Sequence, residues 1–180
     1  MRLAKLPQNS IPPSELDLIH FGDKVFLEAF DCGDEDLNAF IKNDAVSYSD
    51  KGIAKTYCCV HQGKPIGFFS VCADAINLSS EERRASFGIE KAHLDYPALK
   101  IARLGVDKTM QHKGIGTFMV YKAVGKALVI AKEIGCRFVT VDAYPAMAGF
   151  YCNLGFIQNQ LDKPKQNLSL RLDLNMVLKE

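Results

Sequence analysis

The chain has 180 residues, of which 48% are hydrophobic, so it can bury one good core but is too short for two full domains. Its 22 basic and 21 acidic side chains give a net charge of +1, so overall charge favours neither a nucleic-acid-binding protein nor one that binds an anionic membrane. We therefore expect a single domain that covers residues 1–180.

The N-terminus and the hydropathy pattern predict a cytoplasmic protein. The opening MRLAKLPQNS lacks the apolar core of a secretory signal, and no apolar run approaches the roughly 20 residues of a membrane span. The six cysteines show no CxxC motif and no Cys/His ligand spacing, and neighbouring Cys58 and Cys59 should point to opposite faces of a strand. Reduced core thiols, with no metal site, are the interpretation we adopt.

A helix and a β-hairpin are the first predicted elements along the chain. Asp31 and Asp34 are N-cap candidates for a helix from about Asp34 to Tyr48, because apolar residues follow at helical spacing. KTYCCVH and IGFFSVCAD are rich in β-branched or aromatic residues, and the turn residues QGKP separate them. Residues 75–98 carry clusters of charge, which predicts a surface excursion with one short helix.

Strands and helices then alternate to the end of the chain. KIARLGV predicts a buried strand, and GIGTFMVYKAVGKALVIAKEIG predicts a helix of about twenty residues with Gly135 as its C-cap. Its predicted apolar stripe comprises Thr117, Tyr121, Val124, Leu128 and Ala131. RFVTVDA predicts a strand, PAMAGFYCNLG a short helix, and NLSLRLDLNMVL a terminal strand. This interleaving indicates an α/β (α+β) fold with a mixed sheet.

Charge is unevenly distributed within this balanced total. Residues 100–137 contain eight basic and two acidic side chains, whereas residues 14–95 contain eight basic and fifteen acidic ones. The basic segment is either a set of solvated helix faces or a surface that binds anions.

The segment QHKGIG, residues 111–116, joins a predicted strand to a predicted helix. A glycine-containing turn at a helix N-terminus presents unpaired backbone N–H groups and the positive end of the helix dipole, which together can hold an anion. Gly114 and Gly116 let the main chain approach a diphosphate, and Gln111, His112 and Lys113 can add donors. The loop is too short for a Walker motif and lacks the third glycine of a dinucleotide fingerprint. Taken alone, it could equally be an ordinary turn before a helix.

In this context the sequence resembles the GNAT acyltransferases. Gln111, Gly114 and Gly116 fill the family's pyrophosphate-loop pattern, Arg/Gln-x-x-Gly-x-Gly/Ala, between a strand and a long helix. TVDAYPAMAGFYCNLGF supplies the second half of the signature, with Phe150-Tyr151 followed by Gly155-Phe156. The predicted hairpin also matches, so the resemblance covers the chain from about Phe30 to its end. It implies a mostly antiparallel central sheet with helices on both faces.

The resemblance also implies acetyl-CoA as acyl donor and assigns it a site. The pantetheine arm would pair with the backbone of Leu104, Gly105 and Val106, and an N–H near Val106 would stabilise the charge on the thioester oxygen. The diphosphate would lie on the backbone of His112, Lys113, Gly114, Ile115, Gly116 and Thr117. Tyr151 would protonate the departing thiolate; without the resemblance, it would read equally well as a core tyrosine. Gly105 permits the close approach of a ligand, or else marks a β-bulge.

The resemblance implies a primary amine as acceptor, which would attack the thioester directly. KIARLGV contains no glutamate to act as base, and we interpret Asp107, Asp142 and His93 as structural. A lysine amine, with a reference pKa near 10.4, is mostly charged at neutral pH and benefits from a base, whereas an α-amine with a pKa of about 7.7 to 8.0 is already substantially neutral. The sequence therefore mildly favours α-amines.

A second resemblance points to one such amine. FDCGDEDLNAFIKNDA followed by ARLGVDKTMQHKGIG is similar to the acetyltransferase toxins of toxin–antitoxin pairs, which acetylate the α-amine of aminoacyl-tRNA. It implies tRNA or an antitoxin as a partner; a homodimer is a separate expectation. Lys163, Lys165 and Arg171 are then expected to meet tRNA phosphates, whereas Lys108 and Lys113 lie near the coenzyme loop. A general amine acetyltransferase is the first interpretation, the toxin is the alternative, and an acyl-CoA-binding module without turnover stays open.

Overall fold

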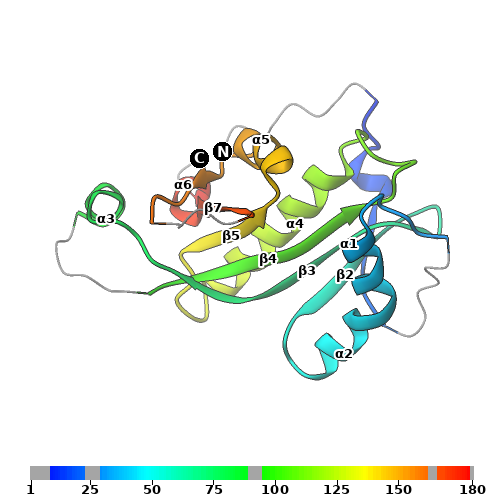
Figure 1. Cartoon of the computed structure of the whole chain (residues 1–180), viewed down its shortest axis with the longest axis horizontal. Coiled ribbons are helices and arrows are strands. Elements are labelled where there is room, and N and C mark those ends of the chain that lie inside the picture. Colours follow the sequence, from blue (N-terminus) through cyan, green and yellow to red (C-terminus); the bar gives the residue numbers. More distant parts are fainter. Residues whose placement is uncertain (1–8, 23–28, 89–94, 162–165, 179–180) are drawn as a thin grey trace. The chain divides into compact units, whose positions relative to one another are not determined.

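The computed structural model describes residues 9–22, 29–88, 95–161 and 166–178 (Figure 1). Its strands are β1 (Asp17–His20), β2 (Lys55–His61), β3 (Lys64–Ile76), β4 (Tyr96–Val106), β5 (Phe138–Ala143), β6 (Ile157–Gln158) and β7 (Leu168–Asp173). Its α-helices are α1 (Glu35–Ala39), α2 (Ala45–Asp50), α3 (Ser80–Phe87), α4 (Ile115–Ile130), α5 (Ala148–Asn153) and α6 (Leu174–Leu178). The described strands form one sheet in the order β1-β2-β3-β4-β5-β7-β6. β1–β2, β2–β3, β5–β7 and β6–β7 pair antiparallel, which confirms the predicted mixed, mostly antiparallel α/β fold.

The chain divides into two compact units. The first comprises Lys5–Cys72 and Ile101–Ala123, and the second holds the rest of the chain. β3, β4 and α4 each contribute residues to both units. That residues 1–180 act as one domain remains a prediction.

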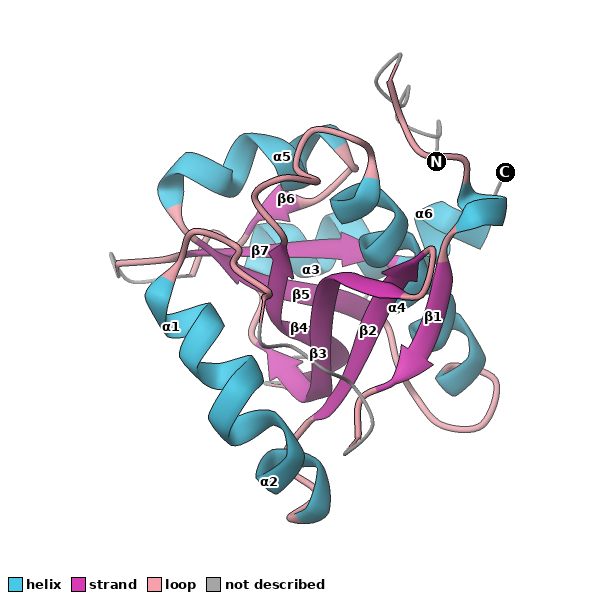
Figure 2. Ribbon diagram, turned by 90° about the vertical axis from the view of Figure 1, so that its right-hand side faces the viewer, coloured by secondary structure: helices cyan, strands magenta, loops and turns pink. Residues whose placement is uncertain are grey.

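The predicted first helix is present as a continuous helical run. It comprises α1, a π-helical turn at Phe40–Asp44, and α2, which follow one another in Figure 2. The Asp34 carboxylate accepts a hydrogen bond from the Leu37 N–H at 2.9 Å, which confirms Asp34 as the N-cap. The predicted bounds are therefore right to within two residues at either end.

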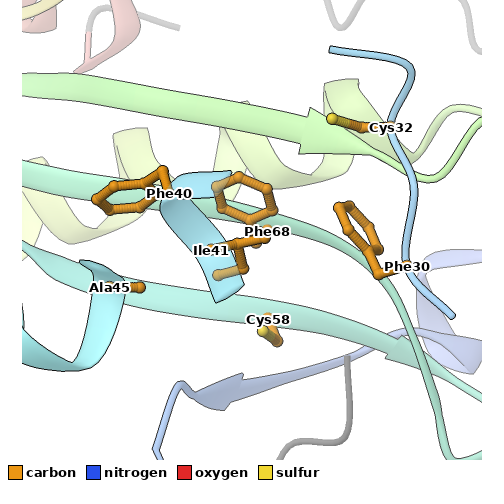
Figure 3. Close-up of a cluster of buried hydrophobic side chains, with 7 residues drawn as sticks. All are labelled: Phe30, Cys32, Phe40, Ile41, Ala45, Cys58 and Phe68. Carbon is orange, nitrogen blue, oxygen red and sulfur yellow. The ribbon is translucent and has the colours of Figure 1, made fainter. Parts of the chain in front are cut away.

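The buried face of this helical run packs on the hairpin strands of the first unit. The resulting cluster, shown in Figure 3, comprises Phe30, Cys32, Phe40, Ile41, Ala45, Cys58 and Phe68. The fully buried Phe68 ring stacks on Phe40, with ring centroids 6.2 Å apart, and meets Phe30 edge-on at 5.7 Å. Burial of these rings contributes to the hydrophobic stabilisation of this unit.

The β2–β3 hairpin turns tightly, as predicted. Gln62 and Gly63 both have positive φ, 50° and 76°, which suits a two-residue loop between antiparallel strands. On β2, Cys58 and Cys59 are fully buried, and burial raises the pKa of both thiols to about 12. Both thiols are therefore protonated at neutral pH.

The second unit contains the predicted excursion and its short helix. Ser79 and Glu82 form a reciprocal capping box at the start of α3. A cluster of Ile76, Leu78, Tyr96, Ala98 and Phe138 forms a buried core in this unit. β4 starts at Tyr96, so it is longer than the predicted strand KIARLGV.

The predictions for α4 need correction. The helix ends at Ile130, and turn residues continue to Ile134, so Gly135 is not its C-cap. The predicted stripe is also wrong, because Thr117, Tyr121 and Leu128 are only half-buried and Ala131 is exposed. The buried residues of the helix, of which only Val124 belongs to the predicted stripe, are Ile115, Phe118, Met119, Val120, Ala123, Val124 and Ala127. They span a wider face than a single stripe, as expected of a helix covered on more than one side.

The predicted terminal strand is also too long. β7 ends at Asp173, and LNMVL forms the short helix α6. Asp173 accepts a hydrogen bond from the Asn175 N–H at 2.8 Å, as an N-cap residue does. None of the helices in the described ranges is long and apolar enough to span a membrane.

Candidate active site

The predicted phosphate loop lies between the end of β4 at Val106 and the start of α4 at Ile115. His112 and Gly114 adopt positive φ, 62° and 80°, which turns the chain sharply before the helix. The Phe118 N–H donates to the Gly114 oxygen at 3.0 Å, which begins the helical ladder. N–H groups before Phe118 in this first turn have no acceptor within the helix. The segment therefore offers backbone donors and a positive helix end to an anion.

The Gln111 side chain serves the protein rather than a ligand in this structure. Its Nε2 donates to the backbone oxygens of Cys32 at 3.0 Å and Val106 at 3.1 Å. The turn is also tied at its far end, where the Lys113 oxygen accepts from the Ile11 N–H at 3.1 Å. A contribution of Gln111 to an anion site would thus come from its backbone.

The turn that follows β4 is linked to the segment before α1. Lys108 Nζ donates to Asp31 Oδ2 at 2.6 Å, and the Lys108 N–H donates to the Asp31 oxygen at 2.9 Å. The Asp31 N–H donates in turn to Asp107 Oδ2 at 3.2 Å. The hydrogen bond from Lys108, with others from Gly33 and Asn38, holds the pKa of Asp31 well below its usual range. The two toxin-like sequence stretches are therefore joined by hydrogen bonds.

Gly105 is required by packing around it. A Cβ added at this position would lie 2.9 Å from Cε1 of Phe68 and 3.4 Å from the Cys32 side chain. Because Phe68 is fully buried, it has little room to move away. This close contact is a third reason for glycine, beyond the ligand approach and the bulge that the sequence suggested.

Tyr151 lies in the second unit, on α5, where its side chain is buried. Its ring meets Phe150 and Phe156 edge-on, with centroids 4.9 and 5.5 Å away. Burial raises the pKa of the Tyr151 hydroxyl to about 12, so the group is protonated throughout the neutral range. Such a tyrosine can donate a proton but cannot act as a base near pH 7.

The expectation that Arg171 faces tRNA is wrong, because its guanidinium is buried. Its Nη1 donates to Glu82 Oε1 and to Asn159 Oδ1, both at 2.7 Å, and the Arg171 and Glu82 side chains are 5% and 4% exposed. Lys163, Lys165 and His93 lie outside the described residues. Arg171 thus anchors α3 to β7 rather than binding phosphate.

Glu82→Gln is expected to destabilise the protein by about 3 kcal/mol, because Arg171 would keep a buried charge without its carboxylate. Urea denaturation followed by circular dichroism would measure the loss. Asp142→Asn is the matched control, since its ion pair with Lys100 is partly exposed and is worth about 0–1 kcal/mol. Equal midpoints for Glu82→Gln and wild type would contradict a role for this pair in stability.

Most of the basic segment is occupied by contacts within the protein. Lys100, Lys108 and Arg137 form ion pairs with Asp142, Asp31 and Asp173. The Arg103 guanidinium lies over the Phe40 ring at 4.2 Å, and Lys122 lies over Phe118 at 5.1 Å. The bonds of Asp107 and Asp142 agree with the structural roles predicted for both. The excess of positive charge in this segment therefore does not by itself indicate an anion-binding surface.

Comparison with known proteins places these features in a family. Residues 52–158, more than half of the chain, match the model of the acetyltransferase (GNAT) domain. A tRNA-acetylating toxin of Mycobacterium tuberculosis is 22% identical over 129 residues, which are 71% of this chain and 76% of the toxin.

Solved structures show the same fold. A tyrosine-to-phenylalanine mutant of KacT aligns with a TM-score of 0.80 at 22% identity, over 92% of this chain and 98% of that one. AtaT complexed with acetyl-methionyl-tRNAfMet aligns with a TM-score of 0.80 at 21% identity, over 91% and 98%. AtaTR bound with acetyl-CoA aligns with a TM-score of 0.76 at 20% identity, over 92% and 98%. The chain belongs to the GNAT family and is an acetyltransferase.

Proposed function

We propose that this protein transfers an acetyl group from acetyl-CoA to the α-amine of aminoacyl-tRNA. Family membership supports the acetyl transfer, and the observation that carries the acceptor is the sequence relationship to a tRNA-acetylating toxin along 71% of the chain. The fold shared with AtaT, whose complex contains acetyl-methionyl-tRNAfMet, agrees with this acceptor. By the same relationship we expect an antitoxin as protein partner.

The donor's diphosphate would be held by the backbone from His112 to Thr117. The positive φ at His112 and Gly114 marks a sharp turn directly before α4, and the first-turn N–H groups of that helix have no acceptor within it, which supports this placement. His112 is exposed and Lys113 half-buried, so their side chains can add charge. These donors would suit the negative charge of a diphosphate.

The pantetheine arm would run along Leu104, Gly105 and Val106 at the end of β4. β4 pairs with β3 and β5, but β5 has 6 residues against the 11 of β4, so β5 covers only part of the β4 edge, which supports the use of β4 backbone by an extended ligand. An N–H near Val106 would stabilise the negative charge that develops on the thioester oxygen.

Tyr151 would supply the proton for the departing thiolate. The raised pKa of Tyr151 keeps the hydroxyl protonated for this purpose. The amine nitrogen forms the new C–N bond as the C–S bond of the thioester breaks. The nitrogen loses one proton, the thiolate takes one from Tyr151, and the proton from the amine restores the tyrosine through solvent, so a neutral amine gives amide and CoA thiol with no net release of protons. At least about half of an α-amine is neutral near pH 8, so it would depend less on a side-chain base than a lysine amine would.

Expression in a bacterium without any antitoxin tests the acceptor. We expect growth arrest and accumulation of acetylated aminoacyl-tRNA, detected by mass spectrometry of nucleoside-linked amino acids after nuclease digestion. Tyr151→Phe, expressed at the same soluble level, is the control and should relieve the arrest. Normal growth without acetylated tRNA at good soluble expression of the wild type would refute tRNA as acceptor and leave another primary amine in its place.

A further inference from the structure

Asp31 has an unusual concentration of hydrogen bonds for a loop residue. Its Oδ1 accepts from the Gly33 N–H and from Asn38 Nδ2, both at 2.8 Å. Its Oδ2 accepts from Lys108 Nζ at 2.6 Å. Its backbone N–H and oxygen bond to Asp107 and Lys108. Asp31 therefore couples the start of α1 to the turn that follows β4.

The turn is held by hydrogen bonds of its own at its start and by contacts with other segments. Within it, Asp107 Oδ1 accepts from the Thr109 N–H at 2.9 Å and the Met110 N–H donates to the Asp107 oxygen at 2.8 Å. From there to Gly114 the chain passes through two residues of positive φ before the helix begins. External contacts, from Asp31 and Cys32 on one side and Ile11 on the other, hold this path in place.

We propose that Asp31, acting through Lys108, is a positioning residue for the diphosphate loop: its carboxylate fixes the backbone of residues 107–114 and thereby sets the affinity for the diphosphate part of the donor. The proposal rests on the proposed function. It also explains why the two toxin-like stretches, which are far apart in sequence, occur together in one chain. Asp31 touches no reacting atom in this scheme, so it should affect donor binding and not the chemical step.

The test compares two donors that differ in the diphosphate. Asp31→Asn keeps the size of the side chain but removes its charge and one acceptor. We expect the KM for acetyl-CoA to rise about tenfold with kcat nearly unchanged. S-acetylpantetheine lacks the diphosphate, so its kcat/KM should be the same for the variant and the wild type. A purely structural defect would impair both donors alike, and that result, or an unchanged KM for acetyl-CoA, would overturn the proposal.

Asp36→Asn is the matched control, because it removes the same charge from an exposed position on the same segment. It should leave both donors unaffected. Lys108→Met gives a second test, should Asp31→Asn fold poorly, and it should reproduce the selective loss for acetyl-CoA. The double variant should be no worse than either single one, since both remove one contact. Additive losses would show that Lys108 acts independently, on the ligand itself, and would contradict the proposal.

A separate experiment tests the diphosphate placement on which the proposed function rests. If Gly116→Glu leaves acetyl-CoA binding intact, the diphosphate does not lie on this loop at all. If Gly116→Glu abolishes acetyl-CoA binding while Asp31→Asn leaves the KM for acetyl-CoA unchanged, the diphosphate does bind at this loop. Only the positioning role of Asp31 is then wrong.

Discussion

Tyr151→Phe is expected to lower kcat by roughly 10²- to 10⁴-fold while leaving the affinity for acetyl-CoA unchanged. The substitution removes only the hydroxyl, and the ring packing against Phe150 and Phe156 stays in place. Steady-state kinetics with calorimetric titration of acetyl-CoA would separate the two quantities. Tyr48→Phe, which removes a hydroxyl from a half-buried tyrosine in the first unit, is the control. A wild-type kcat in this variant would show that solvent, and not Tyr151, protonates the thiolate.

The pH dependence gives an independent check on this acid. Because burial raises the pKa of Tyr151 to about 12, its proton is available at every pH below that value. The rate should therefore rise with pH as the acceptor α-amine loses its proton, with a midpoint at about 7.7 to 8.0, and then stay level to about pH 10. A decline between about pH 8 and pH 10 would identify an acid of lower pKa than Tyr151.

Sequence motifs of a few neighbouring residues predicted the helix cap and the hairpin turn, because contacts between those same residues form both. Asp34 caps the first helix because a carboxylate there meets the Leu37 N–H, and Gly63 closes the hairpin because its φ is positive. The end of α4 was not predictable in this way. Gly135 resembles a C-cap in sequence, but the helix has already ended in a series of tight turns from Ala131 to Ile134.

The C-terminal helix shows the limit of periodicity. LNMVL is a short apolar run that continues the alternation of β7, and such runs do not distinguish a strand from a helix. The cue was Asp173, whose carboxylate accepts from the Asn175 N–H and also binds Arg137. An N-cap residue within an apparent strand is therefore a stronger indication of a helix than the alternation around it is of a strand.

For the site, the motif identified the loop residues but not what supports them. Gln111, Gly114 and Gly116 lie close together in the chain, so the sequence alone reveals their pattern. Asp31 and Lys108 are separated by 77 positions, and a single sequence gives no sign that they pair. Arg171 shows the same limit. It was expected to meet tRNA phosphates, yet its guanidinium is buried against Glu82 and Asn159.

Gly116→Glu is expected to weaken acetyl-CoA binding by at least about 100-fold, because a carboxylate would face the diphosphate at close range. Gly114 is the less suitable position for this test. Its φ of 80° strains any other residue, so Gly114→Glu would combine a backbone effect with the electrostatic one. Gly116 lies within the first turn of α4, where a glutamate is favourable for the helix dipole and the fold should persist.

Gly125→Glu makes the same change of charge on the same helix and serves as its control. Gly125 is exposed, and a Cβ there meets no atom within 4 Å, so this variant should fold and bind acetyl-CoA as the wild type does. Calorimetric titration at low and high salt would compare the two, and the difference between them should shrink as salt screens the added charge. Wild-type affinity for acetyl-CoA in a folded Gly116→Glu protein would show that the diphosphate does not bind at this loop. Equal weakening in both variants would instead point to long-range repulsion by the added charge, with no specific contact at Gly116.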